Sequence, residues 1–94
     1  MSRTLGSPRH RALVEFVIKE RKAAGLTQVQ VAKKLRRYQS YVTLLETGQR
    51  RLDVVEFMDI ADAIGFDAPA AIKRLYKIPK KIGIYGESQP EAAP

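Results

Sequence analysis

The stretch TQVQVAKKLRRYQSYVTLLETG, residues 27–48, decides the fold, because its spacing predicts two short helices joined by a tight turn. Thr27 and Gln30 match a capping box, in which the threonine hydroxyl accepts from the Gln30 backbone amide and the Gln30 side chain bonds back to the Thr27 amide. A helix should therefore begin at Gln28. Its inward side chains would be Val31, Ala32 and Leu35, which share one face.

The second half of this stretch predicts another helix over residues 39–47. Val42 and Leu45 are apolar and three residues apart, so a helix here would bury both on one side. The outward side is then left with Gln39, Ser40, Thr43 and Leu44.

This layout resembles the helix-turn-helix of the lambda-repressor-like family, also called Cro/CI-like or XRE, over about residues 9–76. The residues that match in order and spacing are Gly25, Leu26, Thr27, Gln28, Val31, Ala32, Leu35, Gln39, Ser40, Val42, Thr43, Leu45, Glu46 and Gly48. In that family the second helix of the motif lies in the major groove of DNA, and its N-terminal side chains contact base edges. The resemblance implies an all-α, compact five-helix domain in which helices two and three form the motif.

The resemblance also implies roles for individual residues. The base-contacting set would be Gln39, Ser40, Thr43 and Leu44. Gln28 would contact a phosphate and brace Gln39, whereas Glu46 matches a mainly structural position. A glutamine can pair with N6 and N7 of adenine, which discriminates against a wrong base by about 1–3 kcal/mol. Leu44 can touch a thymine methyl, pack on Tyr41 or make no contact.

The turn departs from the family's pattern at three positions. Arg36 stands where glycine is usual, and a non-glycine residue in a left-handed turn costs about 1 kcal/mol. Arg37 replaces an apolar residue. Tyr38 replaces Ser, Thr or Pro, so a side-chain cap worth about 1 kcal/mol should be lost.

Basic residues flank the proposed reading helix at both ends. Those expected to contact the sugar-phosphate backbone are Arg36, Arg37, Arg50 and Arg51. The alternative is a solvated charge cluster or, for Arg51, an ion pair with Asp53 or Glu56. A further basic arm could come from Arg3, Arg9 and Arg11.

Two flanking segments predict the remaining helices. Ser7 and Pro8 start a helix that runs to about residue 24, before Gly25. Its inward side chains would be Leu13, Phe16 and Val17. Asp53 and Glu56 repeat the capping box for a fourth helix, which Gly65 ends. The expected buried stripe of that helix is Val54, Phe57, Ala61 and Ile64. A fifth helix would start near Asp67, with Pro69 in its first turn, and run through Ile72 and Leu75.

Composition agrees with a small binding domain. The 94 residues carry 17 Lys and Arg against 10 Asp and Glu, giving a net charge of +7 and a pI of about 10.0, which favours polyanions. The absence of cysteine excludes disulfides and thiolate metal sites. The sequence has no apolar run of signal-peptide or membrane-span length, so we expect a soluble, cytoplasmic protein with no membrane contact.

The sequence favours no enzymatic activity. It contains no Ser-His-Asp set, no metal-ligand spacing and no Gly-rich phosphate loop, so we expect neither cofactor nor metal. His10 is expected on the surface of the first helix. Tyr41 is expected to pack its ring at the helix seam and leave its hydroxyl in water, rather than to stack on bases.

We therefore divide the chain into a flexible N-terminal arm (1–7), a helix-turn-helix DNA-binding domain (8–76) and a C-terminal tail (77–94). The last part of the tail is expected to be disordered, because it is rich in Pro, Ala and acidic residues. Ile78, Ile82 and Ile84 would pack on the fifth helix or take part in a homodimer contact.

The expected function is a sequence-specific double-stranded DNA-binding transcriptional regulator, a repressor or autoregulator. It would act as a homodimer that reads a short palindrome through the helix at 39–47. One alternative is an antitoxin that binds a toxin protein, plausibly through the Ile-rich tail, and also represses its own operon. Another is a structural role in which no operator is read.

Overall fold

Five α-helices make up the computed structural model over residues 6–79, which are the residues it describes. They are α1 (Pro8–Ala23), α2 (Gln28–Leu35), α3 (Gln39–Glu46), α4 (Val54–Ile64) and α5 (Ala68–Leu75). The described part of the chain contains no strand, so the expected all-α, five-helix architecture is confirmed. Every predicted boundary agrees with the structure to within one residue. No helix of the described residues is long and apolar enough to cross a membrane.

Local capping chemistry starts the helices where the sequence predicted. The Thr27 hydroxyl accepts from the Gln30 amide at 3.1 Å, and the Gln30 side chain accepts from the Thr27 amide at 2.8 Å. Asp53 and Glu56 make the same reciprocal pair at the start of α4. Each pair satisfies two amides that the first helical turn leaves without partners.

The turn between α2 and α3 contains two residues that are locally unfavourable: one has a left-handed backbone conformation, and the other lacks a side-chain cap. Arg36 has φ 59° and ψ 43°, so it occupies the left-handed region that favours glycine. Its amide nevertheless bonds the Lys33 carbonyl at 3.1 Å, and the next amide, of Arg37, bonds the Ala32 carbonyl at 2.9 Å. Tyr38 makes no side-chain cap, as expected. Packing of the two helices must therefore hold the turn in place.

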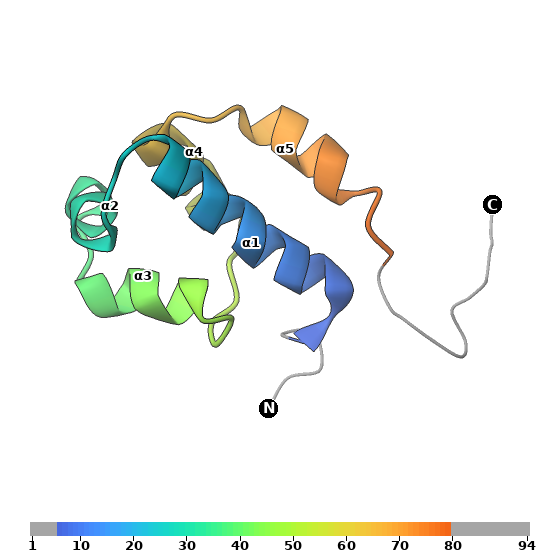
Figure 1. The fold of residues 1–94 in the computed structure, drawn as a ribbon, viewed down its shortest axis with the longest axis horizontal. Helices are drawn as coiled ribbons and strands as arrows, with labels where there is room; N and C mark the ends of the chain where they lie inside the picture. Colours follow the sequence, from blue (N-terminus) through green and yellow to red (C-terminus); the bar gives the residue numbers. More distant parts are fainter. Residues whose placement is uncertain (1–5, 80–94) are drawn as a thin grey trace.

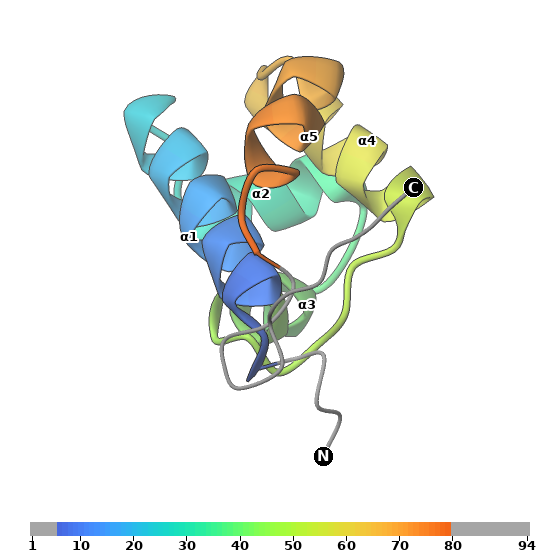
Figure 2. The same cartoon turned by 90° about the vertical axis from the view of Figure 1, so that its right-hand side faces the viewer.

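The core lies between all five helices. Figure 1 shows α1 running diagonally across the molecule, with α5 along one side of it and α3 along the other, and Figure 2 shows α2 closing the far end. The buried side chains that fill this space are Val17, Val31, Ala32, Val42, Leu45, Phe57, Ile60, Ala61, Ile64 and Ala71. Phe66 caps the cluster with its ring edge-on to Phe16 at 5.0 Å between centroids.

The predicted stripe of α4 was wrong at one end. Val54, at the first position of α4, is 73% exposed, whereas Phe57, one turn further along the same stripe, is 5% exposed. Ile60, which the sequence analysis omitted, is the most buried large side chain of the described residues at 1% exposure. Helical periodicity predicts which residues share a face, but not where along the helix its neighbours end.

Arg9, which the sequence offered as one member of a possible basic arm, is bonded within the fold. Its guanidinium donates to the Ile78 carbonyl at 2.9 and 3.2 Å and to the Tyr76 carbonyl at 3.2 Å. It also lies over the Tyr76 ring, 5.1 Å from the centroid. A cation is favourable at a helix C-terminus, so Arg9 fastens α1 to the end of α5. Arg3, Ile82 and Ile84 lie outside the described residues.

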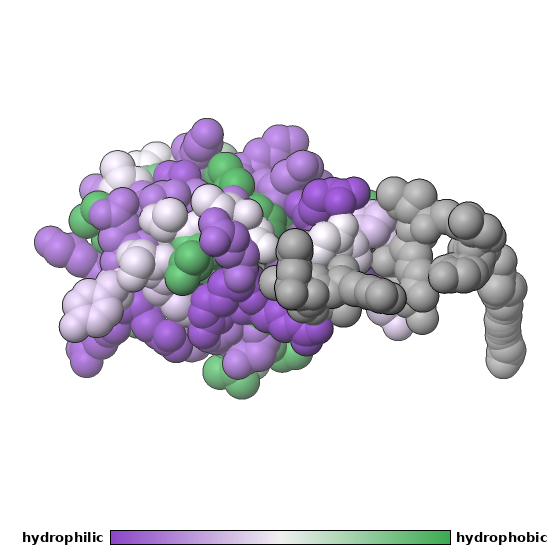
Figure 3. Space-filling view, turned by 90° about the horizontal axis from the view of Figure 1, so that it is seen from below, coloured by the Kyte–Doolittle hydropathy of each residue, from purple (hydrophilic) through white to green (hydrophobic). Residues whose placement is uncertain are grey.

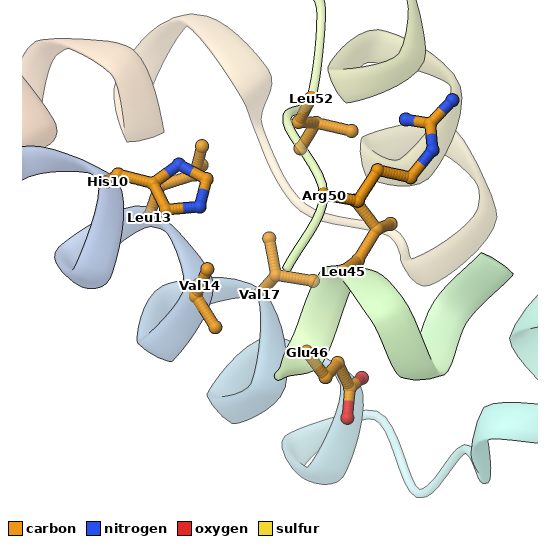
Figure 4. A pocket seen from close by; sticks show the side chains of 8 residues that line it. All are labelled: His10, Leu13, Val14, Val17, Leu45, Glu46, Arg50 and Leu52. Carbon is orange, nitrogen blue, oxygen red and sulfur yellow. The ribbon is translucent and has the colours of Figure 1, made fainter. Parts of the chain in front are cut away.

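His10, expected on the surface of the first helix, is partly exposed, and one edge of its ring is turned inward. Its ring lines a small apolar cavity with Leu13, Val14 and Val17 of α1 and with Leu45 and Leu52 across from them (Figure 4). Its Nε2 atom is buried and has no hydrogen-bond partner among the described residues. Burial lowers the pKa of His10 below its ordinary value of 6.5, and the positive charge of Arg51 lowers it further.

This burial makes stability depend on pH. Because the folded pKa of His10 is lowered, the unfolded chain takes up the proton first as the pH falls below 6.5. We expect the free energy of unfolding to fall between about pH 7 and about pH 5, and His10→Leu to flatten that slope. Chemical denaturation at several pH values measures both. Because the chain has one histidine, an equal slope in wild type and variant would contradict the assignment.

Candidate nucleic-acid interface

The outward side of α3 presents the four side chains that the sequence assigned to it. Gln39, Ser40 and Leu44 are exposed, Leu44 by 40%, and Thr43 is half-buried. The face that carries α3 is predominantly hydrophilic in the space-filling view (Figure 3). Val42 and Leu45, on the opposite side of the same helix, are buried in the core, so their packing sets the rotation of α3.

Gln28, at the start of α2, connects two of these side chains. Its Oε1 atom accepts from the Thr43 hydroxyl at 3.1 Å and from the Gln39 amide nitrogen at 3.4 Å. Its own amide nitrogen donates to Glu46 at 2.9 Å. The expected contact between Gln28 and Gln39 is therefore present, and Thr43 joins it. Hydrogen bonds of this kind restrict the rotamers of the outward side chains.

Glu46 is the buried end of this network. Its two carboxylate oxygens accept from Arg21 of α1 at 2.6 and 2.9 Å, and one of them also accepts from Gln28. The two charged side chains are 11% and 6% exposed. Arg21 donates a further bond to the Leu26 carbonyl at 2.9 Å. A buried carboxylate needs such a full set of partners, so the structural role expected for Glu46 is confirmed.

A second cluster of charges surrounds Tyr41 at the rim of α3. The guanidinium carbons of Arg37 and Arg50 lie over the Tyr41 ring, 4.3 and 4.7 Å from its centroid. Glu56 accepts from Arg50 at 3.0 and 3.1 Å in a bidentate pair. Sequence reasoning missed this pair, because it joins a loop residue to a helix across six positions and follows no periodic spacing.

The cluster also sets the protonation of two of its members. The hydrogen bonds from Arg50 hold the pKa of Glu56 below its ordinary value. Burial raises the pKa of Tyr41, and the negative charge of Glu56 and a hydrogen bond with it add to that shift. The ring packs beneath the two guanidinium groups, as the predicted place at the helix seam suggests, and is only partly exposed.

The arginines that flank α3 gather around an open hollow. It is lined by Arg36, Arg37, Tyr38, Ser40, Tyr41, Leu44 and Arg50. Tyr38 is 87% exposed there, whereas Arg51 lies exposed in the loop between α3 and α4. A basic hollow of this shape beside a helix end suits an anion of the DNA backbone. Among residues 6–79, no group of three His, Asp or Glu side chains could hold a metal ion.

Comparison with known proteins agrees with this geometry. A family model described as a helix-turn-helix domain matches residues 7–75. A solved structure of an XRE-family like protein from Pseudomonas syringae pv. tomato str. DC3000 is similar at 44% sequence identity and a TM-score of 0.70. The similarity covers 72% of this chain and 83% of that chain. The chain belongs to the XRE-like helix-turn-helix family.

As a member of this family, the protein is a DNA-binding transcription regulator with an all-α fold. Helix-turn-helix domains of this kind are typically not enzymes. No match was found among curated proteins.

The buried pair between Arg21 and Glu46 yields a stability prediction for this XRE-like domain. Arg21→Met leaves the Glu46 carboxylate buried with Gln28 as its remaining charge-stabilising partner. We expect a loss of about 3–5 kcal/mol in the free energy of unfolding, measured by chemical denaturation. A loss below about 1 kcal/mol would show that the carboxylate is not held as described.

The double variant Arg21→Met/Glu46→Leu separates stability from function. An apolar pair of similar volume often replaces a buried ion pair at little cost, so most of the lost stability should return. The same change removes the acceptor for Gln28, which then no longer fixes Gln39 and Thr43. We expect weaker binding to DNA at near-normal stability. Full recovery of both would mean that the network does not serve the reading face.

Proposed function

We propose that the protein is a repressor or autoregulator that binds a short palindromic operator in double-stranded DNA as a homodimer. The observation that supports this most directly is the pair of hydrogen bonds that Gln39 and Thr43 donate to the side-chain oxygen of Gln28. A side chain held in one rotamer discriminates between bases better than a mobile one, because less conformational entropy is lost on contact. Side chains that merely covered a solvated surface would gain nothing from such bracing.

In this proposal α3 lies in the major groove and reads bases with Gln39, Ser40, Thr43 and Leu44. Gln39 and Thr43 supply hydrogen bonds, and the exposed Leu44 can meet a thymine methyl. Phosphate contacts come from Gln28 and from three of the flanking arginines, Arg36, Arg37 and Arg51. The fourth flanking arginine, Arg50, was expected from the sequence to contact a phosphate as well, but it is bonded to Glu56.

Repression requires only that the protein bind DNA, whereas activation requires a second binding surface as well. A domain bound across a promoter excludes polymerase by occupying the duplex, whereas activation requires a surface that binds polymerase favourably. The side that carries α3, which this proposal places against DNA, has a predominantly hydrophilic surface in the described residues (Figure 3). We therefore propose steric exclusion as the mechanism.

Selection of bound duplexes from a random DNA pool at near-physiological salt tests base reading. The wild type should enrich a palindrome, and Gln39→Ala should lose information at one position in each half-site. Gln49→Ala is the matched control, because Gln49 is an exposed glutamine outside α3 and its loss should leave the preferred sequence unchanged. No enrichment, with binding that falls steeply as salt rises, would refute sequence-specific reading.

The homodimer is tested separately, by sedimentation of the full chain. One domain reads one half-site, and a dimer binds two half-sites about one helical turn apart. The large apolar side chains left exposed on α4, on α5 and at the C-cap of α5 offer surface for such a contact: Val54, Val55, Met58, Ile72 and Tyr76. We expect a dimer at high micromolar concentration or on the operator duplex. A monomer under both conditions would contradict the proposal.

A further inference from the structure

We propose that Glu56 gives the two arginines beside Tyr41 different roles: Arg50 is its permanent counter-ion, and Arg37 alone binds a DNA phosphate. Glu56 thereby limits this cluster to one phosphate contact, although the sequence offers two arginines. The inference rests on the proposed function only in placing this side of the molecule against DNA. It does not require that any operator be read.

Arg50 is bonded to both carboxylate oxygens of Glu56, so it would have to break two hydrogen bonds to bind a phosphate. Each carboxylate oxygen accepts from a different guanidinium nitrogen, at 3.1 Å for Oε1 and 3.0 Å for Oε2. The Glu56 side chain is 12% exposed, so little water reaches it to replace the lost bonds. Bidentate charge-assisted pairs are the strongest hydrogen-bonded pairs between side chains. Moving Arg50 to a phosphate would leave a largely covered carboxylate without its main partner.

Glu56 is itself fixed in position by the backbone. Its Oε1 atom accepts from the Asp53 amide at 3.0 Å, while its own amide donates to Asp53 at 2.7 Å. The carboxylate therefore cannot follow Arg50 outward without opening the capping box of α4. Arg50 is held further by a bond to the Arg51 carbonyl at 2.8 Å.

Arg37 is held much less firmly by the same carboxylate. Its Nη2 atom lies 3.7 Å from Oε2 of Glu56, beyond hydrogen-bond distance, and its side chain is 47% exposed. Its guanidinium rests on the Tyr41 ring at 4.3 Å and lines the open hollow beside α3. The stacking positions the group without using its N–H donors, so these remain available to a phosphate.

The cluster as a whole therefore carries one net positive charge. Arg50 and Glu56 neutralise each other, and Arg37 supplies the charge that remains. Tyr41 is a positioning residue, since its ring supports Arg37 and Arg50. Arg37 would bind Glu56 if Arg50 were absent, because it already lies within 3.7 Å of that carboxylate.

Because Arg37 can take the place of Arg50 at Glu56, the salt dependence of DNA binding distinguishes the phosphate ligand from the counter-ion. The logarithm of the affinity falls with the logarithm of salt concentration by about 0.9 for each phosphate that the protein neutralises. The probe is a duplex of random sequence, titrated at several salt concentrations with the full chain. The variants are Arg37→Gln, Arg50→Gln, Glu56→Gln and Arg50→Gln/Glu56→Gln. Glutamine at position 56 can still complete the capping box, so the fold is retained.

The slopes should change in a non-additive pattern. All changes refer to the magnitude of the slope, that is, to how steeply the affinity falls with salt. Arg37→Gln should reduce this magnitude by about 0.9, because the arginine that binds the phosphate is lost. Arg50→Gln should lower it as much, because Glu56 then captures Arg37. Glu56→Gln should raise it by about 0.9, because Arg50 becomes available. The double variant Arg50→Gln/Glu56→Gln should return to the wild-type slope, since neither the competitor nor its counter-ion remains.

The double variant decides the question. If Arg50 itself binds a phosphate, the double variant stays below wild type by about 0.9, and the inference is overturned. An unchanged slope in Glu56→Gln also overturns it, as does failure of the wild type to bind the duplex at low salt. Thermal denaturation of each variant confirms that it is folded at the assay temperature. If the selection enriches no palindrome but the slopes change as described, the proposed sequence reading is refuted and the inference stands. If a palindrome is enriched but the slopes do not change as described, only the inference is refuted.

Discussion

The carboxylate of Glu46 joins three helices, and the geometry of the reading face depends on it. Glu46 belongs to α3, accepts two bonds from Arg21 of α1, and accepts a third from Gln28 of α2. Gln28 in turn holds Gln39 and Thr43 on the outer side of α3. A buried charge tolerates few arrangements of its partners, whereas apolar packing tolerates many. The ion pair therefore fixes the register of the motif more narrowly than the surrounding core does.

Glu46 and Glu56 each form a bidentate pair with one arginine, and the role of each pair depends on how exposed its two side chains are. Glu46 and Arg21 are both nearly buried, so their pair orients helices. The Glu56 side chain is 12% exposed and that of Arg50 is 36% exposed, so this pair lies nearer the surface and regulates how much positive charge faces the hollow beside α3. The count of 17 Lys and Arg consequently overstates the number of cations that the protein can offer to DNA. The relevant quantity is the number of cations whose donors are not already satisfied by carboxylates.

The fold could be predicted because its signals are local. The two capping boxes, the left-handed Arg36 and the missing cap at Tyr38 each depend on a few consecutive residues. The errors concern residues whose environment comes from distant segments. Val54 continues the apolar stripe of α4, but it is exposed. His10 lines a cavity with Leu45 and Leu52, which come from a distant part of the sequence. Arg9 donates to the Ile78 carbonyl, just after α5. Nothing in their own sequence neighbourhoods contains that information.

The sequence by itself determined the helix boundaries, the buried faces of α2 and α3 and the identity of the four outward side chains of α3. Capping and periodicity act over three or four residues, so the printed order of residues suffices for them. Only the tertiary structure decided which charges are neutralised. Arg21 reaches Glu46 across 25 positions, and Arg50 reaches Glu56 from a loop. Ion pairs depend on distances in space, and burial decides their strength; both arise only when the helices have packed.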